Sequence, residues 1–244
     1  MINQERFDLA LRCAIEKLPT NQIGTLSEKT LHRVLKYFFE PNDEFHEVEC
    51  YGSVADIKGE NGIIEIQTRS FDKMLPKLER FLPSERVNIV YPIVENKTIC
   101  LIDSCSGEAV SQRKSPKKGR AWDALFEISA IRNFIPHENL TVTLVFVDAV
   151  ETRLNGETKK VGRKKTSKLD CIPTSINRVV EMKNTNDFFV LLPDKLPAEF
   201  SAYDFGKITG ARAIKLHNSL KFLMSLGILT REKGDGRAYI YTRK

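Results

Sequence analysis

Two stretches of the first hundred residues repeat hydrophobic positions at the spacing of a helix. In residues 26–39 these positions are Leu31, Val34, Leu35 and Phe38. Such residues share one face of a helix, and Ser27 stands where a helix cap is expected. Residues 70–82 carry a second apolar stripe. Pro76 within it either begins the helix proper or kinks it, because proline is tolerated mainly in a first turn. The pattern therefore predicts two amphipathic helices.

Between these helices the chain follows the pattern of a β-hairpin. Residues 53–57 are a short, mainly apolar stretch, and residues 62–68 form a strand in which Ile64 and Ile66 alternate with Glu65 and Gln67. The link 58–61 contains the Gly and Asn that hairpin turns favour. We therefore expect the two segments to be adjacent strands.

Three polar side chains are expected to meet on this hairpin. Glu65 and Gln67 share the strand face opposite to Ile64 and Ile66, because strand side chains alternate. Pairing of the strands brings Asp56 close to Glu65, with Gln67 one pleat further along. Two carboxylates and an amide are hard oxygen donors that suit Mg²⁺, with Mn²⁺ as the other candidate. Such a metal polarises a phosphate and lowers the pKa of a bound water.

The next hydrophobic patterns predict a buried sheet. Residues 86–93 and 97–102 have the pattern of strands, and residues 121–131 that of a helix. Residues 140–150 form a nearly continuous apolar run, which is typical of a strand buried on both faces. The fold class expected is α/β, with a mixed sheet flanked by helices over residues 1–155.

The last sixty residues have a different order of elements. Residues 200–210 predict a short helix and a turn, and residues 211–226 a longer helix ended by Gly227. Residues 228–233 and 237–242 then predict a hairpin around two glycines. We expect this unit to form a second domain over residues 186–244, joined to the first by a basic linker or loop over residues 156–185.

The composition is that of a globular protein. Of 244 residues, 41% are hydrophobic and 29% charged. No apolar run approaches the roughly 20 residues that span a bilayer, and the first residues show no export signal. The five cysteines are scattered without a CxxC pair, so zinc is not expected. Reduced thiols in a cytoplasm are the plainer interpretation.

The net charge of +6 includes two basic segments that contain no acid. Residues 112–120 carry five basic side chains and residues 159–168 carry six, and both segments have the composition of loops. Basic loops neutralise phosphates. The residues expected to contact nucleic acid here are Lys117, Lys118, Arg120, Lys164 and Lys165. The alternative is a pair of solvated loops without a partner.

The hairpin resembles the PD-(D/E)xK nuclease superfamily. In that superfamily a hairpin supplies an Asp and then an acidic-x-Lys triplet, and these positions here hold Asp56 and Glu65. Gln67 stands in place of the Lys, and Ala55 in place of the Pro that precedes the Asp. The order helix, strand, strand, helix, strand over residues 26–93 also matches. The resemblance implies a restriction endonuclease-like fold.

The same resemblance implies roles for further residues. Members often begin with a helix whose Glu reaches the metal, a place that Glu28 fits. The alternative for Glu28 is a first-turn acid that favours the helix dipole. For His32, one turn later, we expect a surface or partly buried side chain. The implied catalytic residues are Asp56, Glu65, Gln67 and Glu28, with the metal held by Asp56 and Glu65.

Residues 193–244 resemble a winged helix-turn-helix, because a helix, a turn, a second helix and a Gly-tipped basic hairpin follow in that order. In such folds one helix enters the major groove and the wing touches the backbone. The implied DNA-binding residues are Arg212, Lys215, Asn218, Lys221 and Arg237. The alternative is a winged helix that mediates protein contacts.

Two functions follow from these patterns. The first is a metal-dependent, restriction-like DNA endonuclease whose winged helix locates the target. The second is a non-catalytic DNA-binding protein or regulator on a decayed nuclease core, which the replacement of Lys by Gln67 favours. The expected partner is double-stranded DNA. No association with a membrane is expected. A homodimer is considered, but the sequence leaves the oligomeric state open.

Overall fold

The computed structural model describes residues 4–16, 30–158, 164–234 and 238–244, with the side chains of residues 156–158 and 164–165 left out. Its centre is a mixed sheet of seven strands with the order β1-β2-β3-β4-β6-β7, in which β5 pairs with β4. The strands are β1 (His46–Cys50), β2 (Ser53–Gly59), β3 (Gly62–Ile66), β4 (Val87–Asp103), β5 (Ala109–Lys114), β6 (Leu140–Thr158) and β7 (Lys164–Met182). The pairs β3–β4 and β4–β6 are parallel, and the others are antiparallel.

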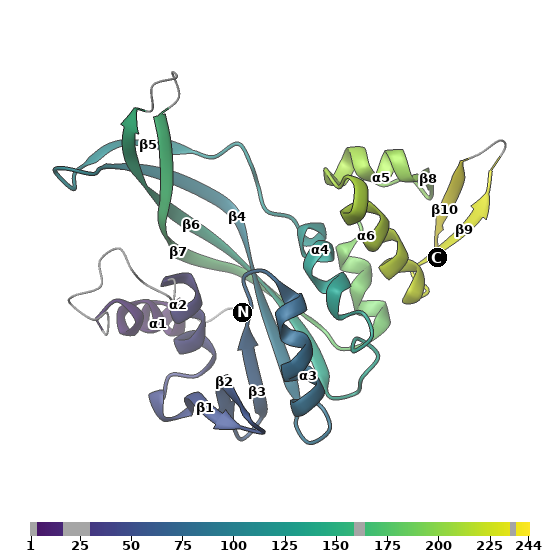
Figure 1. The fold of residues 1–244 in the computed structure, drawn as a ribbon, viewed down its shortest axis with the longest axis horizontal. Helices are drawn as coiled ribbons and strands as arrows, with labels where there is room; N and C mark the ends of the chain where they lie inside the picture. The colour runs from purple at the N-terminus through teal and green to yellow at the C-terminus, as the bar shows by residue number, and fades with distance from the viewer. Residues whose placement is uncertain (1–3, 17–29, 159–163, 235–237) are drawn as a thin grey trace.

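Helices cover both faces of this sheet (Figure 1). On one face lie α1 (Gln4–Glu16) and α2 (Thr30–Phe39), and on the other lie α3 (Leu75–Phe81) and α4 (Leu125–Ile128). Short 3₁₀ turns complete the helical segments, at Asp43–Phe45, Phe71–Met74, Ala121–Ala124, Ser129–Ile131 and Thr185–Leu191. The expected mixed sheet flanked by helices is therefore confirmed.

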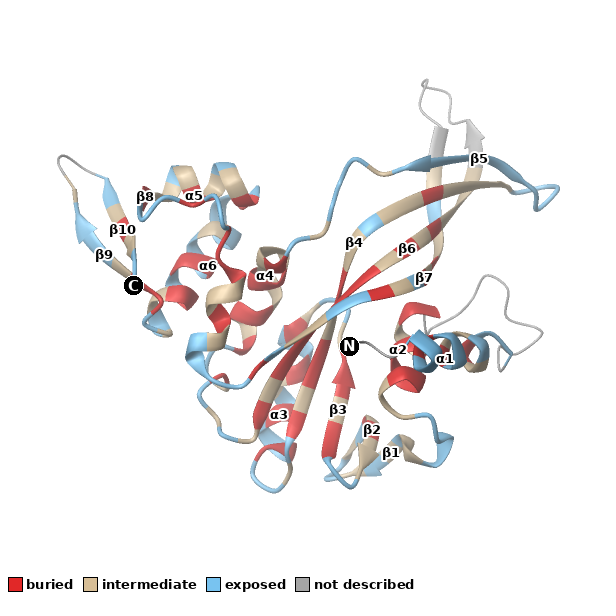
Figure 2. Cartoon of the chain, turned by 180° about the vertical axis from the view of Figure 1, so that it is seen from behind, coloured by how far each residue is buried: buried red, intermediate tan, exposed pale blue. Residues whose placement is uncertain are grey.

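The central strands are buried on both sides, as the apolar run in residues 140–150 predicted. Leu144 packs with the α3 and α4 side, and its neighbour Val145 packs with the α1 and α2 side. In β4 the neighbours Ile89 and Val90 divide in the same way. Figure 2 shows the buried residues gathered along these strands and on the inner surfaces of the helices.

Three sequence expectations about this sheet were wrong. Residues 86–93 and 97–102 are one strand, β4, with an irregularity between Val94 and Asn96. Residues 156–185 are not a linker, because β7 occupies Lys164–Met182 and pairs with β6. The basic segment 112–120 is not all loop, because β5 extends to Lys114. β5 and the first half of β7 are polar, so they lack the hydrophobic alternation by which strands are recognised. Backbone hydrogen bonds to the neighbouring strands stabilise them instead.

The outer parts of four strands form a projecting arm (Figure 1). We define the arm as residues 96–103 of β4, all of β5, residues 148–158 of β6 and residues 164–175 of β7. At its centre the side chain of Glu151 is only 4% exposed, and three cations surround it. Lys97 Nζ lies 2.8 Å, Arg153 2.5 Å and Lys168 3.5 Å from its carboxylate oxygens. These contacts join β4, β6 and β7.

The C-terminal residues form a second, smaller sheet with two helices. Its elements are β8 (Glu199–Ser201), α5 (Ala202–Thr209), α6 (Ala213–Ser225), β9 (Leu229–Lys233) and β10 (Tyr239–Arg243). The strands are antiparallel in the order β8-β10-β9. Ser201 caps α5 through Asp204, and Gly227, at φ 71°, follows the end of α6. The expected helices and hairpin are confirmed.

These C-terminal elements share a hydrophobic core with the large sheet. Leu220 and Leu223 of α6 belong to the same buried cluster as Leu125 of α4 and Leu144 of β6. Within the described part of the chain, no helix is long and apolar enough to cross a membrane.

The ion cluster of the arm gives a test of its contribution to stability. Burial alone raises the pKa of Glu151, but hydrogen bonds from Lys97 and Arg153 outweigh it and lower the pKa from 4.5 to about 2. Glu151→Gln removes the anion and leaves the cations crowded, so the free energy of unfolding at pH 7 should fall by about 2–4 kcal/mol.

The pH dependence has a defined sign. Because the folded pKa lies below the unfolded one, the stabilisation by Glu151 is complete above about pH 4.5 and is lost as the pH falls towards 2. Urea unfolding of both proteins should therefore show a gap in stability that shrinks on acidification. A gap that is the same at pH 7 and at the lowest pH where both proteins fold would contradict this account.

Candidate active site

The site lies where strands β2 and β3 separate. Their backbone pairing runs from Gly59 and Gly62 to Ile57 and Ile64. Beyond that point, hydrogen bonds from backbone to side chain take the place of the backbone pairs. Ile66 N–H donates to Asp56 Oδ2 at 2.7 Å. In return, Asp56 N–H donates to Glu65 Oε1 at 3.3 Å. The two carboxylates therefore sit side by side at the open end of the hairpin, as the sequence predicted.

Glu65 is 2% exposed and is paired with a lysine that the sequence analysis missed. Lys77 Nζ lies 3.0 Å from Oε1 and 2.8 Å from Oε2 of Glu65. Lys77 belongs to α3, which begins at Leu75 with Pro76 in its first turn. The crossover between parallel strands β3 and β4 carries this helix back over the sheet. That topology was the signal that could have placed Lys77 over Glu65.

His32 contacts the other carboxylate. It lies on α2, on the opposite face of the sheet from α3, and its Nε2 is 3.2 Å from Asp56 Oδ2. Its side chain is 20% exposed, which agrees with the expected partly buried position. The sequence analysis did not assign it to the site. Glu28, four residues earlier in the sequence, lies outside the described residues.

Gln67 lies beside the site but outside the strand. The strand β3 ends at Ile66, not at Thr68 as expected, and the Gln67 N–H donates to Val90 O at 2.9 Å. Its half-buried side chain makes no hydrogen bond to the part of the chain that the structure describes. Gln67 therefore follows Glu65 by two residues without pairing with it, and the ammonium that contacts Glu65 comes from Lys77 on α3.

The pKa values of the two neighbouring acids shift in opposite directions. Desolvation, followed by the charge of Asp56, raises the pKa of Glu65 to about 7, although Lys77 opposes the shift. Desolvation also acts to raise the pKa of Asp56, but His32, the Ile66 N–H and Lys77 outweigh it and leave that pKa lowered. At neutral pH the site therefore holds one carboxylate and one carboxyl near its titration point.

The expected DNA-binding residues fall on two surfaces. Lys117, Lys118 and Arg120 are on the connector after β5, where Lys117 and Lys118 are exposed and Arg120 lies 6.0 Å from the Trp122 ring. The residues Arg212, Lys215, Asn218 and Lys221 are exposed at or on α6. The side chains of Lys164 and Lys165, and the whole of Arg237, lie outside the described residues.

Comparison with known proteins assigns a family but no activity. The model of the family "Domain of unknown function (DUF8091)" matches residues 29–183, more than half of the chain, so the protein belongs to this family. An uncharacterized protein of Treponema pallidum (strain Nichols) is 29% identical over 223 residues, which cover 91% of this chain and 88% of that protein. That alignment therefore extends past residue 183 into the C-terminal elements. No solved structure matches the chain.

The raised pKa of Glu65 gives a test of the geometry that does not require any activity. Between about pH 4.5 and 7 the folded protein holds a proton that the unfolded chain has lost, so the free energy of unfolding should fall as the pH rises. The decrease should reach at most about 3 kcal/mol. It should be absent in Glu65→Gln, measured by urea unfolding without divalent metal. An equal pH dependence in both proteins would show that Glu65 is not desolvated beside Asp56.

Proposed function

For this member of a family of unknown function, we propose a metal-dependent DNA endonuclease activity of the PD-(D/E)xK type. The observation that carries the proposal is the meeting of Asp56, Glu65 and Lys77 at the open end of one hairpin. Two carboxylates and an ammonium are the side chains that this chemistry uses. Here the ammonium comes from α3, because Gln67 occupies the motif position.

The donor set fits Mg²⁺ or Mn²⁺ better than a metal that needs a full cage of side chains. No group of three or more His, Cys, Asp or Glu residues suited to a metal occurs in the described ranges. Mg²⁺ usually takes one or two carboxylates and completes its shell with water and phosphate oxygens. Asp56 and Glu65 would hold the ion. When bound, it would polarise the phosphate and lower the pKa of a water.

The chain's own residues would position and neutralise the reacting groups. Asp56 is fixed by the Ile66 N–H and by His32, so its oxygens have a set direction. Lys77 lies within hydrogen-bonding distance of Glu65 and could instead turn to a water or a phosphate oxygen. His32 is a positioning residue, since it acts through Asp56.

A second candidate function is DNA binding without cleavage. Lys77 already contacts both oxygens of Glu65, which neutralises that carboxylate without a metal ion. This pairing favours a decayed core whose role is to recognise DNA. The two proposals share the same DNA-binding surfaces and differ only in the fate of the phosphodiester bond.

The arm offers one wall of a DNA-binding channel. Its basic face consists of Lys97, Arg113, Arg153 and Lys168. Three of these cations meet at Glu151, and Arg113 lies on the same face because it and Glu151 both pair with Ile99. A duplex on this face would have its phosphates neutralised, with an affinity that falls as salt rises.

The C-terminal unit offers the opposite wall. The order β8, α5, α6, β9, β10 supports a winged helix, in which α6 would be the helix that enters the major groove. Its exposed stripe carries Ile214, Asn218 and Lys221, and Ile214 is 74% exposed. Such a side chain suits contact with a thymine methyl, and Asn suits bidentate pairing with adenine.

The first experiment tests cleavage of duplex DNA with Mg²⁺ or Mn²⁺. Asp56→Ala and Glu65→Ala should each lower the rate about 10²-fold or more. Lys77→Ala should do the same, and the double variant Lys77→Ala with Gln67→Lys should recover part of the rate, because the ammonium returns from the motif position. Lys73→Met, one turn from Lys77, should leave cleavage of bound DNA unchanged.

Two outcomes would decide between the candidates. Wild-type protein that binds duplex DNA but does not cleave it with either metal supports the non-catalytic function. Cleavage that persists in both Asp56→Ala and Glu65→Ala would show that the nuclease site is not at this hairpin.

The second experiment tests base recognition by α6. Selection from a random duplex library should give wild-type protein a preferred sequence that Asn218→Ala and Ile214→Ala weaken, with about 1–3 kcal/mol of discrimination lost for a bidentate contact. Lys221→Ala should instead reduce affinity for all duplexes alike, because phosphate contacts carry no sequence information. A preferred sequence unchanged by both α6 variants would place recognition elsewhere.

A further inference from the structure

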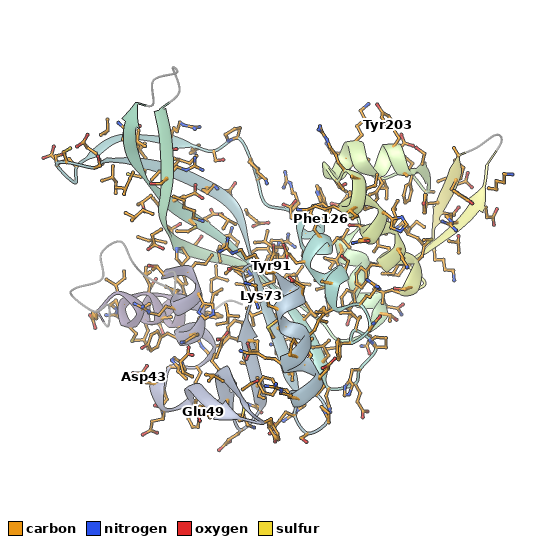
Figure 3. All side chains as sticks on the ribbon, viewed as in Figure 1. Asp43, Glu49, Lys73, Tyr91, Phe126 and Tyr203 are labelled. Carbon is orange, nitrogen blue, oxygen red and sulfur yellow. The ribbon has the colours of Figure 1, made fainter. Side chains whose placement is uncertain are left out.

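A cavity of about 600 Å³ lies where the arm meets the C-terminal helices. Its walls include Tyr91 and Lys97 of β4, Lys117 of the connector, Phe126 of α4 and Lys215 of α6. In Figure 3, Tyr91 and Phe126 lie at the base of the region between the arm and the C-terminal unit. The volume is in the range of small-molecule sites.

The wall beside the connector is formed by close backbone contact. Gly119 N–H donates to Val94 O at 2.9 Å, and a side chain at Gly119 would meet that oxygen at 2.4 Å. The connector can lie this close to β4 only with glycine at this position. This contact therefore holds the connector wall of the cavity against β4.

Two aromatic rings give the cavity an apolar surface. The Tyr91 ring is supported by Phe71, with 5.5 Å between the ring centroids. Phe126 is half-buried, and Lys215 Nζ lies 5.2 Å from its ring centroid. Burial raises the pKa of Tyr91 to about 12, so its hydroxyl stays protonated and can donate a hydrogen bond. These groups suit a planar, polar-edged ring.

Three lysines give the cavity a positive charge. Lys97, Lys117 and Lys215 line it together with the acids Asp123 and Glu127. Both acids already accept backbone N–H groups, from Arg120 to Asp123 at 2.9 Å and from Ser70 to Glu127 at 2.7 Å. Lys97 Nζ also pairs with Glu151 at 2.8 Å, whereas the exposed Lys117 has no ion pair with any residue that the structure describes.

The cavity is a neighbour of the carboxylate site. Gln67 N–H bonds Val90 O, the residue before Tyr91, and Glu127 holds the backbone of Ser70 and Phe71. The segment 67–71, which follows Glu65 closely in the sequence, is thus bonded to β4 beside Tyr91 and to Glu127 of the cavity wall.

We propose that this cavity binds one nucleotide, with its base against Tyr91 and Phe126 and its phosphate beside Lys117 and Lys215. The ligand has two sources: an unpaired nucleotide of a bound DNA strand, or a free mononucleotide. The first source rests on the DNA-binding part of the proposed function, and the second does not. Neither requires cleavage.

The experiment has two arms, both with the full-length protein and without divalent metal. In one, dAMP and inorganic phosphate are titrated separately by calorimetry. In the other, a duplex carries 2-aminopurine opposite an abasic position, and its fluorescence reports stacking. The variants are Lys117→Ala and Phe126→Leu, with Lys207→Ala as the control on an exposed lysine of α5 outside the cavity.

Phe126→Leu should weaken the observed binding about tenfold, as expected for loss of one base–aromatic stack. Lys117→Ala should weaken it several-fold, and Lys207→Ala should have no effect. Saturable dAMP binding with this pattern identifies the free nucleotide. A fluorescence change with this pattern, without dAMP binding, identifies the strand nucleotide.

Three results would overturn the proposal. They are the absence of both signals, inorganic phosphate binding as tightly as dAMP, or signals that Lys117→Ala leaves unchanged. Lys117 is exposed on the connector, so that variant stays informative if Phe126→Leu does not fold. A protein that binds nucleotide but cuts no DNA would refute only the nuclease proposal, and a nuclease without nucleotide binding would refute only this one.

Discussion

Two acidic side chains stand together at the open end of a hairpin, and the surrounding structure is arranged to neutralise them. Asp56 and Glu65 each bond a backbone N–H of the opposite strand, so neither can move away without breaking a hydrogen bond. Buried like charges are costly unless cations or hydrogen bonds offset them. His32 from α2 contacts Asp56, and Lys77 from α3 contacts Glu65. The helices on both faces of the sheet are thereby tied to one pair of acids.

This arrangement makes Lys77 and a divalent ion competitors for Glu65. The Lys77 ammonium contacts both oxygens of the carboxylate, yet desolvation, followed by the charge of Asp56, raises the pKa of Glu65 to about 7. A divalent ion shared by the two acids would remove that repulsion and release Lys77 towards the substrate. The nuclease proposal requires this exchange. The alternative, a DNA-binding protein without cleavage, leaves Lys77 where it is.

The sequence predicted the local features of the site and missed those that depend on distant elements. The pairing of Asp56 with Glu65 followed from strand alternation across a short turn, and the confirmed helices and hairpin of the C-terminal unit followed from equally local patterns. Lys77 and His32 join the site only through the packing of two helices on opposite faces, which no local pattern encodes. The strand β7 was missed because its first half is basic and polar and is stabilised by pairing with β6.

The central claim is that Asp56 and Glu65 hold one divalent ion in the presence of DNA. A crystal structure of the protein with Mn²⁺ and a duplex would test it directly, because Mn²⁺ can be located by its anomalous scattering. The account predicts one peak bound by both carboxylates, with Lys77 moved from Glu65 to a phosphate or water oxygen. A structure with DNA bound and Lys77 still paired with Glu65, without Mn²⁺ at the two acids, would contradict it.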